Sequence, residues 1–300
     1  MSFLDRIAEA NRCDPKHYRP FRVESKRVGF VKPIIADFLR DWPEVFQVTP
    51  EAVELSPILA NASPDNRSAT IAEVAKDLQR VGLTASHWWD EPYAVNTCFG
   101  ETPLFMLERG AIQAFGVTGY GVHLNGFVRS SRSFQKPHHL KMWIGRRALN
   151  KPSAPGQLDQ LVAGGQPAGI GLRANLIKEC AEEAAIPVNL ATQAQAVSVV
   201  SYCLETEQGL RPDILYCFDL ELPSAFEPRN TDGEVEEFYL WPVEQVLEIV
   251  RETTDFKFNC ALVIIDFLAR HGYLDPEECA YLQILNGLRQ RESLLRQFTE

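Results

Sequence analysis

The segment LVAGGQPAGIGLRANLIKECAEEAAIP, residues 161–187, carries the strongest pattern in this chain. Its apolar start ends in two glycines at 164–165, which permit turns and a close ligand approach that a side chain would block. After a loop, a helix carries Glu179, Glu182 and Glu183 at spacings of three and four residues, so all three carboxylates project to one side. The segment therefore predicts, in order, a strand, a glycine turn, a loop and an acidic helix.

The three glutamates crowd like charges together, which costs a few tenths of a kcal/mol per exposed pair and more when the pair is partly buried. A hard divalent cation removes that cost, because Mg²⁺ is commonly held by a few carboxylates together with waters and phosphate oxygens. Such an ion stabilises charge that develops on a transferred phosphoryl group and lowers the pKa of a bound water. A solvated acidic face is the alternative, and charge runs usually form one. The adjacent glycine pair favours the metal site.

At this point the segment resembles the Nudix box, whose pattern is G-x5-E-x7-R-E-U-x-E-E-x-G-U with U an aliphatic residue. Counted from Gly164, the pattern positions are filled by Glu179, Glu182, Glu183 and the apolar Ile186. The resemblance implies that the three glutamates hold Mg²⁺, or Mn²⁺ in its place. It also implies that Glu182 and Glu183 take part in catalysis.

Three of the glycine and charged residues that the pattern names are replaced. Ile170 stands where the first glutamate is expected, and Lys178 replaces the arginine. These two changes agree with each other, because a lysine lacks the bidentate fork of arginine and the missing glutamate is the obvious partner of that fork. Ala185 replaces the late glycine, at a cost of roughly 1 kcal/mol if the backbone there keeps a positive φ.

The resemblance extends along nearly the whole chain, through GEVEEFYLWPVEQV, FKFNCALVIIDFLARHGYL and the N-terminal PFRVESKRVGFVKP. These segments are similar to a Nudix subfamily that has an extra N-terminal domain and is labelled thiamin-pyrophosphokinase-related. That similarity implies a hydrolase that converts thiamin diphosphate, or its oxidised and damaged forms, to the monophosphate and phosphate. A kinase would need a Gly-x4-Gly-Lys-Ser/Thr phosphate cradle, which the chain lacks.

Two other functions stay open. A Nudix hydrolase of another diphosphate, such as a nucleoside diphosphate derivative, would keep the metal site and change only the pocket. A non-catalytic binding protein with the Nudix fold is the second, and the departures at Ile170, Lys178 and Ala185 motivate it.

A later glutamate is a further candidate for catalysis. Glu234, in TDGEVEEF, resembles the downstream glutamate that some Nudix enzymes use as a metal ligand or base. Glu236 and Glu237 compete for this role, and strand alternation would put Glu234 and Glu236 on one face with Glu237 on the other. A charged strand edge that prevents aggregation is the alternative for all three.

The stretch HHLKMWIGRRA offers the best substrate-binding residues. Arg146 and Arg147 end a predicted strand and can pair with diphosphate oxygens, while Trp143 can stack on a flat heterocycle or a cation. Solvated arginines and a core tryptophan are the alternative, because strands routinely bury alternate aromatic residues. The complete predicted substrate-binding set is Gly164, Gly165, Trp143, Arg146, Arg147 and Lys178.

Other segments are weaker candidates for the ligand site. His138 and His139 titrate near neutral pH, but adjacent residues on a strand point to opposite faces, so at most one reaches a site. The aromatic SHWWDEPY at 86–93 and the basic KRVGFVK at 26–32 are candidates to cover the ligand from the N-terminal domain. A plain packing role is the alternative for both segments.

Composition limits the classes of partner. The formal net charge of −10 argues against general binding to nucleic acid or anionic membranes, which needs a positive field. The seven cysteines show no Cys-x-x-Cys pair, which favours reduced structural thiols. No apolar run is long enough for a signal peptide or a membrane span. We expect a cytoplasmic protein that acts on a small-molecule diphosphate, while its oligomeric state stays open.

The predicted fold class is α/β (α+β): a Nudix α/β/α sandwich with a mixed sheet. We expect a small N-terminal α+β domain at 1–112, the Nudix domain at 113–252 and a C-terminal extension of two helices at 253–300. The N-terminal domain should contain a short strand at 22–23, a turn at Gly29 and a helix at 33–40.

Overall fold

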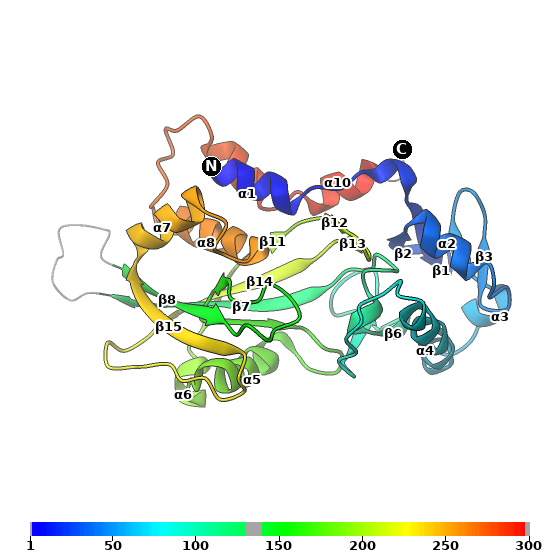
Figure 1. Ribbon diagram of the computed structural model, residues 1–300, viewed down its shortest axis with the longest axis horizontal. Coiled ribbons are helices and arrows are strands. Elements are labelled where there is room, and N and C mark those ends of the chain that lie inside the picture. Colours follow the sequence, from blue (N-terminus) through cyan, green and yellow to red (C-terminus); the bar gives the residue numbers. More distant parts are fainter. Residues whose placement is uncertain (1, 130–139, 298–300) are drawn as a thin grey trace.

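A seven-stranded mixed sheet lies at the centre of the structure, a computed structural model that describes residues 2–129 and 140–297 (Figure 1). The strand order is β11-β14-β7-β8-β15, with β10 paired to β7 and β9 paired to β8. β14 runs parallel to β7, and the other pairs are antiparallel. The strands are β7 (Tyr120–Arg129), β8 (Leu140–Arg147), β9 (Leu158–Asp159), β10 (Val162–Gly165), β11 (Gln195–Ser201), β14 (Ile214–Glu221) and β15 (Val235–Pro242).

Helices cover both faces of this sheet, which confirms the predicted mixed α/β class (Figure 1). Because side chains alternate along β8, Met142 and Ile144 pack on one face while Trp143 packs on the other. The first face is covered by α1 (Phe3–Ala10), α7 (Val243–Glu252), α8 (Phe258–Arg270) and α9 (Tyr281–Gly287). The second face is covered by α5 (Leu172–Ala184) and α6 (Val188–Ala191).

The N-terminal unit has its own sheet, of order β2-β1-β4-β3, and its own apolar core. Four phenylalanines, Phe21, Phe46, Phe105 and Phe115, meet at the centre of that core. The elements are β1 (Arg19–Val23), β2 (Lys26–Val31), α2 (Pro33–Leu39), β3 (Phe46–Val48), β4 (Val53–Leu55), α3 (Pro57–Ala60), α4 (Pro64–Arg80) and the separate hairpin β5 (Pro92–Val95) and β6 (Phe105–Glu108).

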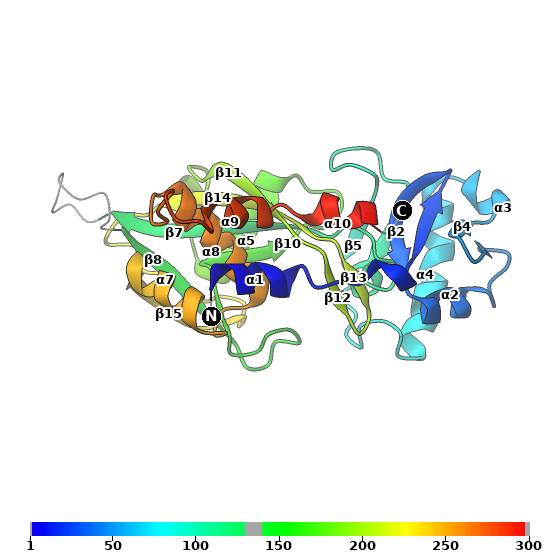
Figure 2. The same cartoon turned by 90° about the horizontal axis from the view of Figure 1, so that it is seen from above.

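Both ends of the chain cross between the two units. α1 precedes the N-terminal sheet in sequence, yet Phe3 and Ile7 pack in the core of the central sheet. From the other direction α10 (Arg291–Gln297) reaches the N-terminal unit, where Leu295 packs with Tyr18 and Phe30 (Figure 2). None of the helices in the described ranges combines the length and apolarity needed to span a bilayer.

Several local predictions need correction. Gly29 lies inside β2 rather than in a turn, because it pairs with Phe21 of β1. The Phe115 carbonyl beside it leaves no room for a side chain at this position. The turn falls instead at Glu24 and Ser25, both with positive φ. The strand predicted ahead of the glycine pair is β10, with the separate short strand β9 just before it, and the C-terminal part has three helices rather than two.

The segment between β11 and β14 is more than a simple turn. It forms a two-stranded arm of β12 (Leu204–Thr206) and β13 (Gly209–Arg211). This arm contacts the N-terminal unit: Leu210 N–H donates to the Gln113 carbonyl at 3.0 Å, and Lys32 pairs with Glu205 at 3.3 Å. The arm therefore holds the two units together beside the site described next.

Candidate active site

The acidic helix forms where the sequence predicts it, from Leu172 to Ala184. Ala185 ends it in the left-handed conformation, with φ of 51°, and its N–H donates to the Cys180 carbonyl. This is the geometry that glycine favours, so the alanine carries a strain of roughly 1 kcal/mol. The departure from the pattern at this position changes the residue but keeps the backbone turn.

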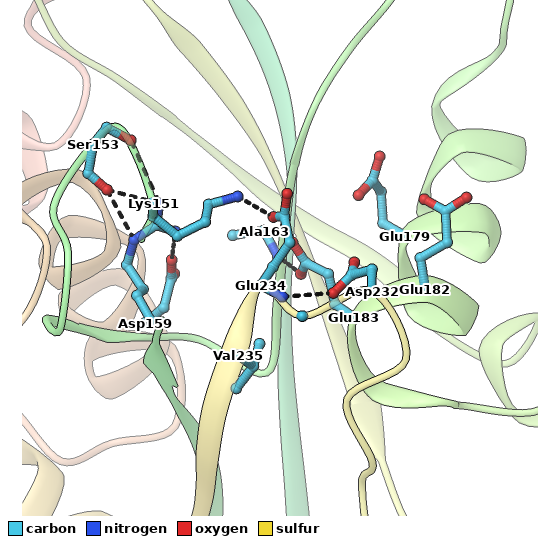
Figure 3. Close-up of polar contacts among 12 residues, drawn as sticks. Lys151, Ser153, Asp159, Ala163, Glu179, Glu182, Glu183, Asp232, Glu234 and Val235 are labelled. Carbon is cyan, nitrogen blue, oxygen red and sulfur yellow. Dashed lines mark hydrogen bonds and ion pairs between the residues drawn. The ribbon is translucent and has the colours of Figure 1, made fainter. Parts of the chain in front are cut away.

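Glu183 lies buried between α5 and β10, with 8% of its surface exposed. Its Oε2 accepts a hydrogen bond of 2.8 Å from the Ala163 N–H (Figure 3). Burial raises the pKa of Glu183 to about 8, although that hydrogen bond opposes the shift, and the charge of Glu179 raises it further. A buried carboxylate of this kind is suited to pair with a cation.

Glu179 and Glu182 are drawn toward Lys178. The lysine Nζ lies 3.3 Å from Glu179 and 2.6 Å from Glu182. Burial raises the pKa of Glu179, and the charge of Lys178 opposes that shift. The predicted substrate-binding Lys178 is therefore a partner of the carboxylates in this structure, so a metal ion would compete with it for the same oxygens.

Gly164 has a clear packing role. A Cβ atom at this position would overlap the side chain of Glu179, so the glycine lets that carboxylate lie against β10. Gly165 is equally constrained on the other side, where a Cβ would overlap the hydroxyl of Tyr93. Because both glycines lack a side chain, the acidic helix and the N-terminal unit approach β10 closely, Glu179 at Gly164 and Tyr93 at Gly165.

The structure brings Glu234, but neither of its rivals, to the carboxylates of α5. Glu234 precedes β15, pairs with Lys151, and lines the same cavity as Glu183 (Figure 3). A β-bulge between Val235 and Glu237 interrupts the simple alternation that we expected, and Glu237 accepts a hydrogen bond from Tyr239 at 2.5 Å. Glu236 and Glu237 do not line the cavity.

A cavity of about 410 Å³ collects these side chains. Its carboxylates come from α5 (Glu179, Glu182, Glu183), from the residues before β15 (Asp232, Glu234) and from the N-terminal unit (Asp90, Glu91). Its cations are Arg109, Arg147, Lys151, Lys178 and Lys257. Within the described ranges, no three His, Cys, Asp or Glu side chains converge as a ready metal site. The oxygen-only donor set on α5 nevertheless fits Mg²⁺ or Mn²⁺, provided Glu179 and Glu182 turn from Lys178 toward Glu183.

Two predicted substrate residues are placed elsewhere. Trp143 lies in the apolar core under α5, because its position on β8 points to that covered face. Arg146 points away from the cavity and donates to the Tyr239 hydroxyl and to the Gly156 carbonyl, each at 3.0 Å. The structure therefore brings neither side chain to the acidic cavity.

Arg147 does line the cavity, but its guanidinium group is already engaged. It pairs with the buried Asp159 at 2.8 Å and donates to the carbonyls of Ser153 at 2.9 Å and Ala154 at 3.1 Å. The pairing with Asp159 outweighs burial and raises the pKa of Arg147. Arg147 thus fixes the loop at 148–157 over the cavity and has few donors left for a substrate.

A second cavity of about 250 Å³ adjoins the first, and both are lined by Ala163, Gly164 and Gly165. Trp89 and Tyr93, from the predicted aromatic segment 86–93, form part of its wall. The basic segment 26–32 lines neither cavity, because it forms β2 in the N-terminal sheet. His138 and His139 lie outside the described residues.

Sequence reasoning missed Arg109 and Lys257, which line both cavities. Each lies about 70 residues or more from the nearest glutamate of the acidic helix, so no local pattern signals either one. Only the approach of the N-terminal unit and of α8 to β10 brings them together.

The sequence of this chain is similar to those of known proteins. A family model described as "Domain of unknown function (DUF4743)" matches residues 2–119. Nudix hydrolase 20, chloroplastic, from Arabidopsis thaliana is 41% identical over 299 residues, which cover 97% of this chain and 78% of the relative. Nudix hydrolase 24, chloroplastic, from the same plant is 41% identical over 290 residues, which cover 96% and 77%.

Among solved structures, the NUDIX domain of Shewanella oneidensis NrtR complexed with ADP ribose is similar, at 18% identity and a TM-score of 0.40. The similarity covers 54% of this chain and 92% of that chain. Both plant relatives are named chloroplastic, so they do not confirm the cytoplasmic location expected above, which stays a prediction.

Proposed function

This chain belongs to the Nudix hydrolase family, and from that premise we propose that it hydrolyses thiamin diphosphate or its oxidised forms with Mg²⁺. The products are the monophosphate and phosphate. The observation that carries the proposal is the pair of adjoining cavities on either side of Gly164 and Gly165. Most of the carboxylates line the first cavity, while Tyr93 and Tyr120 line only the second and Trp89 lines both. This arrangement suits a substrate with a diphosphate at one end and a flat heterocycle at the other.

In the proposed reaction the carboxylates of α5 bind the metal ion, and Glu234 acts as the base. Glu179, Glu182 and Glu183 hold Mg²⁺, or Mn²⁺ in its place, which when bound neutralises charge on the diphosphate and activates the attacking water. The Ala163 N–H fixes one oxygen of Glu183, so its carboxylate is already oriented. Lys151 orients Glu234 by an ion pair, and we assign Glu234 as the residue that accepts the proton of the water.

A panel of diphosphates tests the substrate. With the purified full chain and Mg²⁺, we expect kcat/KM for thiamin diphosphate or an oxidised form to exceed that for ADP-ribose and nucleoside diphosphates at least about tenfold. Orthophosphate release is measured directly, and nucleoside monophosphate release from ADP-ribose is measured with a phosphatase. A higher kcat/KM for ADP-ribose or a nucleoside diphosphate would contradict the proposed substrate and assign the chain to nucleotide derivatives instead.

Metal binding should release a proton from Glu183. Because its pKa is about 8 without a cation, the group is mostly protonated at pH 7 and must ionise to bind metal. Affinity for Mg²⁺ or Mn²⁺ is therefore expected to rise about tenfold per pH unit up to pH 8 and to level off above it. Calorimetric titration in two buffers of different ionisation enthalpy should show about one proton released at pH 7.

The matched control for this titration is Glu183→Gln, which has no proton to lose. Its weaker metal binding should be nearly independent of pH between 6 and 9 if Glu183 is the titrating group. An unchanged pH dependence in the variant would assign the proton to another carboxylate.

A further inference from the structure

We propose that Arg109 and Lys257, two cations outside the predicted Nudix domain, bind the substrate's diphosphate at the junction of the two cavities, and that the cavity behind them takes its flat organic group. The inference rests on the proposed function, because it assumes a substrate with a diphosphate. It also gives the N-terminal unit a role in substrate binding, since Arg109, Trp89 and Tyr93 come from that unit.

Arg109 is held in place by its own unit. Its guanidinium group pairs with Glu91 at 2.7 Å and lies 5.2 Å from the centre of the Trp89 ring. Glu108 in turn fixes this turn of chain, because its carboxylate accepts the backbone N–H groups of Trp89 at 2.8 Å and Glu91 at 3.0 Å. Arg109 keeps 37% of its side chain exposed, so donors of the guanidinium face the junction. A preorganised guanidinium is the group best suited to bind phosphate oxygens.

Lys257 reaches the junction from the other side. It precedes α8, and its backbone N–H donates to the Leu158 carbonyl at 3.0 Å, which fixes the start of the helix against β9. Its ammonium group makes no ion pair within 4.0 Å among the described residues. Burial would raise the pKa of Asp159, but the charges of Lys257 and Arg147 hold it below its usual range. Lys257 is therefore a cation near carboxylate charge with donors available to a phosphate.

The contact between the two units is close enough to define one site. A Cβ atom at Gly165 would overlap the Tyr93 hydroxyl and would lie 3.6 Å from Cζ of Arg109. The loop after β10 is also tied to the N-terminal unit, since the Ala168 N–H donates to the Pro92 carbonyl at 2.8 Å. A diphosphate bound at the acidic helix therefore lies within reach of Arg109 without any movement of the units.

The second cavity has the chemistry of a pocket for a flat, polar ring. Trp89, Tyr93 and Tyr120 supply aromatic surface, and burial raises the pKa of Tyr120 to about 12, so it stays neutral. Asp213 and Asn259 supply fixed polar groups, with Asp213 oriented by Arg211 at 2.7 Å. Polar groups held in this way select a ring by its pattern of hydrogen-bond donors and acceptors.

Two substrates that share a diphosphate but differ in the ring test this division. With Mg²⁺ and the full chain, kcat and KM are measured for thiamin diphosphate and for ethyl diphosphate. Arg109→Ala and Lys257→Ala should each raise KM about tenfold or more for both substrates, with Arg109→Lys and Lys257→Arg recovering part of the loss. Trp89→Ala should lower the ratio of kcat/KM for thiamin diphosphate over ethyl diphosphate about tenfold, and Trp89→Phe should restore most of it.

The control is Trp241→Ala. Trp241 stacks on Tyr239 at 4.6 Å on β15, outside both cavities, and its loss should leave all four kinetic constants within twofold. Circular dichroism and thermal unfolding show whether each variant is folded. Unchanged KM values in folded Arg109→Ala and Lys257→Ala would overturn the diphosphate assignment, and an unchanged substrate ratio in Trp89→Ala would overturn the ring assignment.

Failure of the proposed substrate is distinguishable from failure of this inference. If the wild-type chain ignores thiamin diphosphate and hydrolyses ADP-ribose, the same ratio is measured for ADP-ribose against ethyl diphosphate. If thiamin diphosphate is the substrate, calorimetric binding of thiamin monophosphate adds a readout without turnover: Trp89→Ala should weaken it about tenfold, whereas the control Trp241→Ala should not.

Discussion

Replacing Glu183 by glutamine is expected to lower kcat at least about 100-fold while making the metal-free protein more stable at pH 8. Catalysis falls because the variant keeps an acceptor for the Ala163 N–H but loses the negative charge offered to a metal ion. Activity is measured by orthophosphate release at saturating Mg²⁺. The two effects have opposite signs, so a variant that was merely misfolded would not reproduce them.

The gain in stability follows from the raised pKa of Glu183. Between its ordinary value near 4.5 and the folded value of about 8, the folded protein binds a proton that the unfolded chain has lost. Stability from this group is therefore complete below about pH 4.5 and declines as the pH rises toward 8. In EDTA at pH 8, urea unfolding should show Glu183→Gln more stable than wild type by a few kcal/mol, with little difference at pH 4.5.

Glu248→Gln is the matched control, because Glu248 lies exposed on α7 and away from both cavities. It should change neither kcat nor the pH dependence of unfolding by a measurable amount. A Glu183→Gln variant with wild-type turnover would remove Glu183 from the metal site. If Glu183→Gln and the wild type show the same pH dependence of unfolding, the carboxylate of Glu183 is not protonated in the folded chain.

Replacing Arg147 by methionine is expected to lower the free energy of unfolding by about 3–5 kcal/mol. The change leaves Asp159, which is only 7% exposed, without its partner at 2.8 Å. It also frees the Ser153 and Ala154 carbonyls, so the loop that carries Lys151 into the cavity loses its anchor. Urea unfolding at pH 7 measures the loss.

Arg146→Met is the comparison, since Arg146 adjoins Arg147 on β8 but lies on the more exposed side. It should cost about 1 kcal/mol or less, because its hydrogen bonds are partly exposed to water. The double change Arg147→Met with Asp159→Leu should recover more than half of the stability lost by Arg147→Met alone, because no buried charge is then unpaired. An Arg147→Met protein within 1 kcal/mol of wild type would contradict the anchoring role.

Sequence patterns within one helix or strand were sufficient to predict much of the local structure of this molecule. Helical spacing placed Glu179, Glu182 and Glu183 on one side of α5, where the structure has them. Helical spacing of apolar residues also predicted the helix at 33–40, which is α2 at Pro33–Leu39. The position of Ala185 predicted a left-handed helix end, which is present with φ of 51°. Each of these features depends on contacts only a few residues apart in sequence.

The direction of side chains on the strands was less predictable. Trp143 and Arg146 were plausible ligand contacts until the structure showed which face of β8 is covered by α5. A bulge next to Glu237 changed the alternation on β15. Alternation gives two faces but does not say which one meets the ligand, because that depends on where helices from elsewhere in the chain pack.

By itself, therefore, the sequence determined the family, the class of fold and the helix that presents the carboxylates. Only the tertiary structure decided that Arg147 anchors the loop at 148–157 and that α1 packs against the central sheet. It also decided that Arg109 and Lys257 line the same two cavities as Gly165. The physical reason is one of distance along the chain. Helical and strand periodicity arise from neighbouring residues, whereas the cavities arise from packing between segments up to about 170 residues apart, for which a single sequence holds no repeating signal.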